Sequence, residues 1–226
     1  MTKRIYFLHG FMGTGDLHFE HQKAFFERDM EVVAFSLPGH GHSTIPACEN
    51  YFESALEWVM EEVKNKGPGY VVGLSLGASL AIHLAIKWPE LVKGAVLTGY
   101  TPFIPDDLKS IMEEQYTYFN NIQENDEETA ASFKQIHGDK WFDTLQKVNK
   151  IMTFHYPSVS ENEIAELEVP LMVLNGGNEL YEVEAIQFLK RSNDKINVGL
   201  IPDAGHTANM DQPDLYNSMV QQFINK

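Results

Sequence analysis

The sequence is poor in two kinds of residue, and each scarcity narrows the possible functions. It has a single cysteine, Cys48, so no disulfide can form within the chain. It has three arginines, Arg4, Arg28 and Arg191, and its 17 basic against 32 acidic residues give a net charge of −15. Nucleic acid and anionic membrane surfaces bind clustered positive charge. We therefore expect neither of them as a partner.

Long hydrophobic runs are also missing. A helix that spans a bilayer needs about 20 apolar residues in succession, and no run approaches that length. The apolar run before His9 and Gly10 is too short for the hydrophobic region of a secretory signal. Together with the single cysteine, this favours a cytoplasmic location. With 226 residues, 43% of them hydrophobic and 22% charged, the chain suits one globular domain with an insertion.

Short apolar runs alternate with segments of helical spacing along most of the chain. The apolar runs occupy residues 3–8, 31–36, 70–72, 93–99, 170–175 and 196–201. The helical segments occupy residues 18–29, 51–66, 76–88, 183–191 and 212–224. Nearly continuous apolar strands are typical of a parallel sheet covered on both faces. The alternation predicts an α/β fold with a doubly wound, mostly parallel sheet.

The segment between the fourth and fifth apolar runs breaks this alternation. Residues 106–121, 126–137 and 140–151 each have helical spacing, and no strand is predicted among them. The sequence therefore predicts a core of residues 1–101 and 169–226, interrupted by a helical cap of residues 102–168.

The pentapeptide Gly73-Leu74-Ser75-Leu76-Gly77 lies between an apolar run and an Ala/Leu/Ile-rich segment. Read as strand, sharp turn and helix, it is a nucleophile elbow, which presents a serine hydroxyl on a tight turn. Glycines permit that turn because side chains at these positions would crowd the neighbouring backbone. Ser75 is therefore the candidate nucleophile.

Several residues with catalytic potential follow directly after predicted strands. They are His9, Ser75, Glu179 and His206, and Gly99 occupies the same place after a further strand. Because the carboxyl ends of parallel strands meet at one edge of a sheet, we expect these residues to lie together.

Further short motifs accompany the elbow: His9-Gly10-Phe11, Pro38-Gly39-His40-Gly41, an acidic residue after Leu174-Asn175-Gly176-Gly177-Asn178, and Ala204-Gly205-His206. In these motifs the chain resembles the α/β-hydrolase fold superfamily. The order serine, acid, histidine is that of the superfamily and differs from the orders of chymotrypsin-like and subtilisin-like proteases. Members commonly carry a strand pair before the His-Gly strand, and eight residues precede His9 here. We therefore expect a sheet of about six strands.

The resemblance implies a role for each matching residue. Ser75 would be the nucleophile, His206 the general base, and Glu179 the acid that orients His206. The backbone N–H groups of Phe11 and Leu76 would form the oxyanion hole. No cofactor is implied.

The acid has alternatives. Glutamate stands where aspartate is usual, and some relatives place the acid after the strand that follows the elbow. Asp106 and Asp107 are the candidates at that second position.

Two further patterns are assigned no chemistry. His40 and His42 form a His-x-His pair, but no carboxylate and histidine cluster completes a metal site, so no metal is expected. The glycines between residues 10 and 15 lack the lysine of a P-loop and the spacing of a dinucleotide fingerprint. His9 is expected to order the oxyanion loop through hydrogen bonds.

The insertion is both aromatic-rich and acidic. It holds more aromatic and methionine side chains than a solvent face tolerates, so some should form an apolar pocket facing the serine. The candidates are Tyr116, Phe119, Trp141, Met152 and Phe154. From residue 103 to residue 168 there are 14 acidic and 5 basic residues, whose field would discourage anionic substrates.

These features predict a serine hydrolase that cleaves small neutral or apolar carboxylic esters through an acyl-enzyme on Ser75. Resemblance also extends to the menaquinone-pathway succinyl-cyclohexadiene-carboxylate synthases, lyases that handle a polyanion with basic pocket residues. Those enzymes commonly carry an arginine soon after the elbow, where this chain has Ala78-Ser79-Leu80. A thioesterase or peptidase would share the same triad, and a non-enzymatic ligand-binding member would need none of it.

Overall fold

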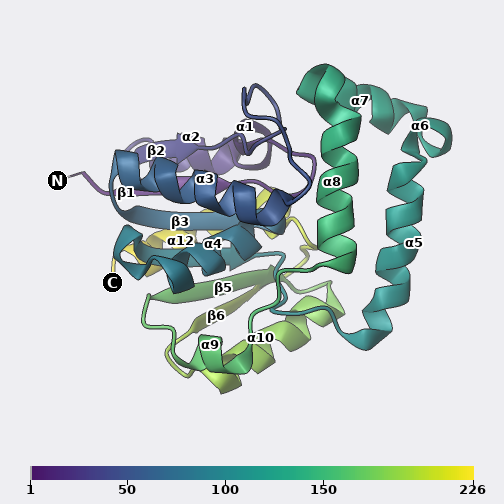
Figure 1. Ribbon diagram of the computed structural model, residues 1–226. Coiled ribbons are helices and arrows are strands. Elements are labelled where there is room, and N and C mark those ends of the chain that lie inside the picture. Colours follow the sequence, from purple (N-terminus) through teal and green to yellow (C-terminus); the bar gives the residue numbers. More distant parts are fainter. Residues whose placement is uncertain (1) are drawn as a thin grey trace.

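The protein is built around one six-stranded parallel sheet (Figure 1). The computed structural model describes residues 2–226. The strands are β1 (Arg4–Leu8), β2 (Glu31–Ala34), β3 (Gly69–Leu74), β4 (Val92–Thr98), β5 (Leu171–Gly176) and β6 (Asn197–Ile201). Their order is β2-β1-β3-β4-β5-β6, and every neighbouring pair is parallel. The predicted α/β class and the sheet of about six strands are confirmed.

Helices cover both faces of the sheet. The core helices are α1 (Gly15–His18), α2 (Glu20–Phe26), α3 (Tyr51–Lys66), α4 (Leu76–Lys87), η1 (Pro89–Leu91), α10 (Leu180–Ser192), α11 (Ala208–Asp211) and α12 (Pro213–Ile224). The helical segment predicted for residues 18–29 is split into α1 and α2. The first of these pieces brings His18 to the carboxyl edge of the sheet, where it lines the cavity described below.

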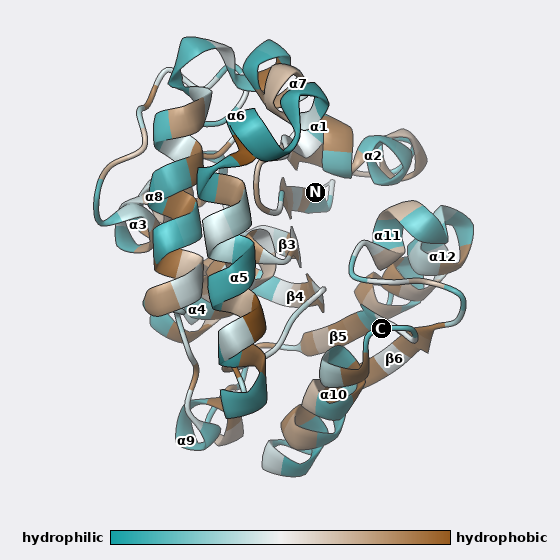
Figure 2. Cartoon of the chain, turned by 90° about the vertical axis from the view of Figure 1, so that its right-hand side faces the viewer, coloured by the Kyte–Doolittle hydropathy of each residue, from teal (hydrophilic) through white to brown (hydrophobic). Residues whose placement is uncertain are grey.

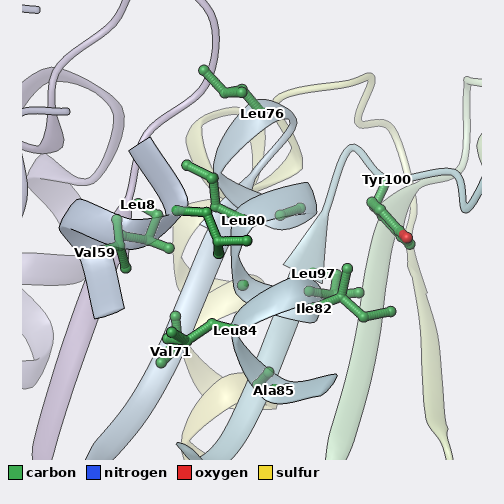
Figure 3. Close-up of a cluster of buried hydrophobic side chains, with 14 of the residues drawn as sticks. Leu8, Val59, Val71, Leu76, Leu80, Ile82, Leu84, Ala85, Leu97 and Tyr100 are labelled. Atoms are coloured by element: carbon green, nitrogen blue, oxygen red, sulfur yellow. The ribbon is translucent and has the colours of Figure 1, made fainter. Parts of the chain in front are cut away.

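Successive residues of each strand contribute to different sides of the core, as the pleat requires. In β1, Tyr6 and Leu8 join the cluster under α3 and α4, whereas Ile5 and Phe7 join the cluster under α2 and α12. Figure 3 shows Leu80 and Leu84 of α4 packed among side chains of the first cluster. The four central strands, β1, β3, β4 and β5, are almost entirely buried and therefore read as continuous apolar runs and not as alternating ones.

Close backbone packing beneath the elbow requires a glycine at position 77. A Cβ atom added to Gly77 would lie 1.9 Å from the carbonyl oxygen of Leu8 and 2.8 Å from that of His9. The start of α4 therefore rests directly on the end of β1. The absent side chain fixes how close Ser75, two residues earlier, comes to the loop after β1.

We expect Gly77→Ala to destabilise the protein by about 3 kcal/mol or more, because the atoms in the way are backbone and cannot rotate aside. Gly177→Ala is the matched control: its added Cβ would meet its nearest atom, the Ile201 carbonyl oxygen, at 3.3 Å. The control should change the free energy of unfolding by about 1 kcal/mol or less. Urea unfolding measures both, and equal losses would contradict the packing argument.

The chain between β4 and β5 is helical. It comprises η2 (Asp106–Leu108), α5 (Lys109–Asn120), α6 (Ile122–Asn125), α7 (Glu127–His137), η3 (Gly138–Lys140), α8 (Trp141–Phe154) and α9 (Glu161–Ala165). Figure 1 shows α5 and α8 side by side, in teal and green, beyond one end of the strands. We call the segment from η2 to α8 the inserted helices.

Hydrogen bonds hold the inserted helices on the loop that follows β2. Nδ1 of His137 accepts from the backbone N–H of Gly41 at 2.8 Å, and the Thr144 hydroxyl donates to the Gly39 carbonyl at 3.1 Å. Nε2 of His137 donates to the Met12 carbonyl at 3.0 Å. Met12 follows Phe11, so the inserted helices also contact the predicted oxyanion loop. No helix among residues 2–226 combines the length and hydropathy needed to cross a bilayer.

Candidate active site

Ser75 occupies the sharp turn between β3 and α4. Its backbone has φ 55° and ψ −114°, in the positive-φ region that residues other than glycine seldom adopt. Its N–H donates to the Thr98 carbonyl at 2.8 Å, which ties the turn to the end of β4. Strain of this kind at a strand-to-helix turn is the geometry of a nucleophile elbow.

Two backbone donors at the same edge are left without acceptors. Within residues 2–226, neither the N–H of Leu76 nor that of Phe11 donates a hydrogen bond. Leu76 begins α4, where the first N–H groups of a helix have no intrahelical acceptor. Both residues line the same cavity as Ser75. The arrangement leaves two donors free for an oxygen atom of a bound molecule.

The imidazole of His206 is hydrogen-bonded to a carboxylate, and that carboxylate belongs to Glu182. His206 Nδ1 donates to Glu182 Oε1 at 2.5 Å. The Glu182 side chain is 8% exposed, whereas that of His206 is 50% exposed. The acid is thus buried behind the ring, and the ring still reaches solvent and the cavity. The other oxygen, Glu182 Oε2, is buried without a hydrogen-bond partner in the described chain.

The pKa of His206 reflects this pairing. Burial lowers the pKa, but the hydrogen bond and the charge of Glu182, with a smaller contribution from the charge of Glu179, outweigh burial and raise it above the usual value of 6.5. The carboxylate therefore stabilises the imidazolium form, as a partner of a general base must.

Glu179, the predicted partner of His206, forms no hydrogen bond or ion pair with it within residues 2–226; Glu182 takes that position in the structure. Glu179 is the residue immediately before α10, and its Oε1 lies toward Gly205, where an added Cβ would approach it to 3.3 Å. The helix was predicted from residue 183 but begins at Leu180, which brings Glu182 into its first turn. Glu179 still lines the cavity.

The two alternative acids lie away from the imidazole. Asp106 and Asp107 belong to η2, which has no buried residue. The carboxylate of Asp106 is almost fully exposed and pairs with Lys109 at 2.6 Å. Neither aspartate forms a hydrogen bond or ion pair with His206 in the described chain.

A buried amide fixes the position of Glu182. Nδ2 of Asn175, near the end of β5, donates to the carbonyl oxygens of Tyr100 at 3.0 Å and Glu182 at 3.1 Å. Its Oδ1 accepts from the N–H of Tyr100 at 3.2 Å. One side chain therefore connects the chain after β4 to the first turn of α10. Asn175 belongs to one of the sequence motifs, but no role was predicted for its side chain. A polar residue in an otherwise apolar strand is the signal that could have indicated one.

The loop that carries His206 is held from two sides. The N–H of Gly205 donates to Asp211 Oδ2 at 2.8 Å, and the Thr207 hydroxyl donates to Oδ1 of the same carboxylate at 3.2 Å. On the other side, a Cβ atom at Gly99 would lie 2.9 Å from the His206 ring. The absent side chain of Gly99, whose φ is +58°, leaves the space that the imidazole occupies.

Ser75, His206 and Glu182 line one cavity of about 610 Å³. The sheet edge supplies its polar end, and the inserted helices supply a largely apolar wall. Four residues of that wall, Leu108, Met112, Gln115 and Phe119, follow one another at helical spacing from the end of η2 along α5. This explains why α5 has no buried residue: one side of it faces the cavity instead of a core. Figure 2 shows α5 beside α8 on the side of the molecule where β3 and β4 end.

Two of the five residues predicted for the pocket line the cavity, and the other three do not. Phe119 and Met152 line the cavity. Tyr116, Trp141 and Phe154 do not. Trp141 is buried in a cluster with Met12 and Leu145. Tyr116 packs edge-on against Phe154, whose side chain is 48% exposed, with ring centroids 4.7 Å apart.

Histidine rings form a row beside the loop that follows β1. His18, His9, His40 and His137 have successive centroid distances of 6.2, 4.8 and 5.4 Å, and we call them the histidine row. His9 Nδ1 donates to the Gly10 carbonyl at 2.8 Å, and its Nε2 accepts from Leu37 N–H at 3.0 Å. These bonds connect His9 to Gly10, next to Phe11, and to Leu37 in the loop after β2. That His9 orders a loop with an oxyanion function stays a prediction. No group of metal-ligating side chains is found among residues 2–226.

Comparison with known proteins assigns this fold to a family. The family model described as the alpha/beta hydrolase fold matches residues 3–147, so the chain belongs to the α/β-hydrolase fold family.

Individual relatives agree with this assignment. The crystal structure of NosK from Streptomyces actuosus superposes with a TM-score of 0.91 and 31% identity, covering 99% of this chain and 97% of that one. Carboxylesterase YbfK of Bacillus subtilis is 25% identical over 211 residues, which are 85% of this chain and 71% of YbfK. Protein PHYLLO of Arabidopsis thaliana is 21% identical over 92% of this chain, and the match spans 14% of its length.

Proposed function

We propose that this protein is a serine esterase that cleaves neutral or apolar carboxylic esters, with Ser75, His206 and Glu182 as its catalytic triad. The observation that carries the proposal is the hydrogen bond from His206 Nδ1 to the buried Glu182 carboxylate, at the cavity that also holds the strained Ser75. Similarity to a carboxylesterase of Bacillus subtilis supports the same reaction class.

In the proposed mechanism, His206 Nε2 takes the proton of Ser75 as the hydroxyl oxygen attacks the ester carbonyl. The N–H groups of Phe11 and Leu76 donate to the oxyanion that develops. His206 then gives its proton to the leaving alcohol, and an acyl-enzyme on Ser75 remains. Water attacks this ester with His206 again as base, which releases the acid and restores Ser75.

The cavity lining supports a substrate without negative charge. No lysine or arginine of the described chain lines it, whereas Glu179 and Glu182 do. An anionic acyl group would meet these carboxylates and no basic side chain to pair with. Methionine and aromatic side chains such as Met112, Met152 and Phe119 offer an apolar surface instead. We propose that residues 102–168 act as a cap that supplies this surface.

The same lining bears on the alternative functions. A lyase that handles a polyanionic substrate would need cationic side chains at the cavity, and the histidines there have no arginine or lysine beside them in the lining. Thioesters and amides would follow the same acyl-enzyme route as esters. The experiment below therefore includes them as substrates.

A fluorophosphonate probe tests the proposal. We expect covalent labelling at Ser75, located by peptide mass mapping, and hydrolysis of short-chain p-nitrophenyl esters that Ser75→Ala abolishes. Ser79→Ala is the matched control, because Ser79 lies buried one helical turn further along α4. A panel with a thioester and an anilide of the same acyl group then ranks the leaving groups. Full turnover by Ser75→Ala would refute the mechanism.

A further inference from the structure

His18 is a polar side chain of the cavity that the proposed triad does not use. It ends α1, in the loop region that follows the predicted oxyanion residues, and lines the cavity together with Ser75 and His206. Gly13 makes room for it: a Cβ atom there would fall between 2.1 and 2.5 Å from three atoms of the His18 ring.

The hydrogen bonding of His18 defines its tautomer. The backbone N–H of Gly10 donates to His18 Nδ1 at 3.1 Å, so Nδ1 carries no hydrogen. A neutral imidazole whose Nδ1 is an acceptor has its hydrogen on Nε2. Within residues 2–226, Nε2 has no hydrogen-bond partner. His18, which lines the cavity, therefore carries an N–H donor for which residues 2–226 supply no acceptor.

Charge and burial keep this donor neutral. Burial, with repulsion from His206 and His137, lowers the pKa of His18 to about 4. At neutral pH the ring therefore keeps Nδ1 as an acceptor for Gly10 and Nε2–H as a donor.

The backbone of His18 is tied to the loop that carries His206. Asn209 Nδ2 donates to the His18 carbonyl at 2.6 Å, and Asn209 lies three residues after His206. Gln22 Nε2 donates to the Asn209 carbonyl at 2.9 Å and to Asn217 Oδ1 at 3.0 Å. This buried amide network fixes α1 and α2 relative to the catalytic histidine, so the position of the donor is set by the fold.

We propose that His18 is a substrate-binding residue, whose Nε2–H donates a hydrogen bond to an oxygen atom of the substrate beside Ser75. The inference rests on the proposed esterase function and adds to it a side-chain donor besides the two backbone N–H groups. The acceptor is either the carbonyl oxygen that reacts or an oxygen bonded to the α-carbon of the acyl group.

Two substitutions of His18 distinguish the role of Nδ1 from that of Nε2. Asparagine places Oδ1 where histidine has Nδ1, so His18→Asn keeps an acceptor for Gly10 and loses the Nε2 donor. Glutamine places its amide N–H₂ near the position of Nε2, so His18→Gln keeps a donor and loses the acceptor at Nδ1. His21→Asn, at an exposed position of α2, is the matched control.

We expect His18→Asn to lower kcat/KM about 10- to 100-fold, the loss of one hydrogen bond in the transition state, and His18→Gln to recover part of it. Each variant is compared with wild type on p-nitrophenyl butyrate and on the isosteric methoxyacetate. Equal losses on both esters place the acceptor at the carbonyl. A loss confined to the methoxyacetate places it on the acyl chain.

Two results would overturn the role of His18 while leaving the esterase intact. One is His18→Asn activity within about twofold of the His21→Asn control on both esters. The other is a larger loss in His18→Gln than in His18→Asn, which would assign His18 only to holding Gly10. A wild-type protein that hydrolyses no ester and is not labelled at Ser75 would overturn the proposed function itself, and the role of His18 with it.

Discussion

Glu182→Gln should lower kcat/KM for ester hydrolysis about 10³- to 10⁴-fold, whereas Glu179→Gln should lower it less than about tenfold. The two glutamates are three residues apart and both line the cavity, but only Glu182 accepts the hydrogen bond from His206 Nδ1. A glutamine at position 182 can present an N–H₂ group to that nitrogen, which favours the wrong tautomer, and it brings no charge to stabilise the imidazolium.

The pH dependence supplies a second readout of the same substitution. His206 must be neutral to take the proton of Ser75, so kcat/KM should rise with pH through the His206 pKa, which lies above 6.5 in the wild type. When the charge of Glu182 is removed, burial still lowers the pKa of His206, and the main interaction that raised it is gone. The acidic limb of the profile should therefore move to lower pH in Glu182→Gln. Glu179→Gln should move it in the same direction by a smaller amount, because the charge of Glu179 contributes less.

Asp106→Asn and Asp107→Asn serve as controls, since both residues lie in η2, which has no buried residue. We expect their kinetics to match the wild type within about twofold. Circular dichroism and thermal unfolding of each variant separate loss of the acid from loss of the fold. If Glu179→Gln or either aspartate variant showed the large loss and Glu182→Gln did not, the assignment of the acid would be refuted.

The difference between Glu179 and Glu182 shows where sequence patterns stop being informative. Hydrophobic periodicity predicted both β5 and α10, and α3 has the same bounds, 51–66, as its predicted segment. The boundary of α10 depends on hydrogen bonds that join distant segments. Gly177 N–H donates to the Ile201 carbonyl and Asn178 N–H to the Ala204 carbonyl, so the chain follows β6 for two residues before the helix begins. Which acid then faces His206 is decided by these contacts.

The cavity lining illustrates a related limit. Aromatic and methionine residues in the insertion predicted that some would face the serine, and Phe119 and Met152 line the cavity. In α5, however, apolar side chains occur on two sides of the helix. Whether Tyr116 or Phe119 faces the cavity depends on how α8 packs against α5, and Tyr116 turns to Phe154 near the end of α8. His18 was missed for a different reason, because it was read as the start of a longer helix.

Acid should destabilise the protein steeply because of three members of the histidine row, His9, His18 and His40. Burial lowers the pKa of His40 to about 3 and that of His18 to about 4, and it holds the pKa of the fully buried His9 well below its usual range. The unfolded chain takes up protons on these residues below pH 6.5, whereas the native protein does not. Stability is therefore retained above pH 6.5 and is lost as the pH falls toward the native pKa values.

At pH 5 each of these three imidazoles should favour the unfolded state by about 2 kcal/mol, a substantial share of the 5–15 kcal/mol typical of folded proteins. Near that pH, the free energy of unfolding should fall by about 4 kcal/mol per pH unit, which corresponds to three protons at about 1.4 kcal/mol each. Urea unfolding between pH 7.5 and 4.5 measures this slope. If the free energy of unfolding fell by about 1.4 kcal/mol per pH unit or less, which corresponds to one proton, the prediction would be contradicted.

His40→Asn tests whether the row is the source of the slope. His40 Nδ1 donates to the Pro38 carbonyl at 3.0 Å, which an asparagine amide can also do, and its Nε2 is buried without a partner. The variant should lose packing and be less stable at pH 7.5. Near pH 5, however, the pH dependence of its free energy of unfolding should correspond to about two protons instead of about three. The exposed His21→Asn should leave the slope unchanged. Because the slope counts protons and not contacts, it separates the titration of His40 from the packing that its removal disturbs. An unchanged slope in His40→Asn would assign the acid sensitivity to other groups.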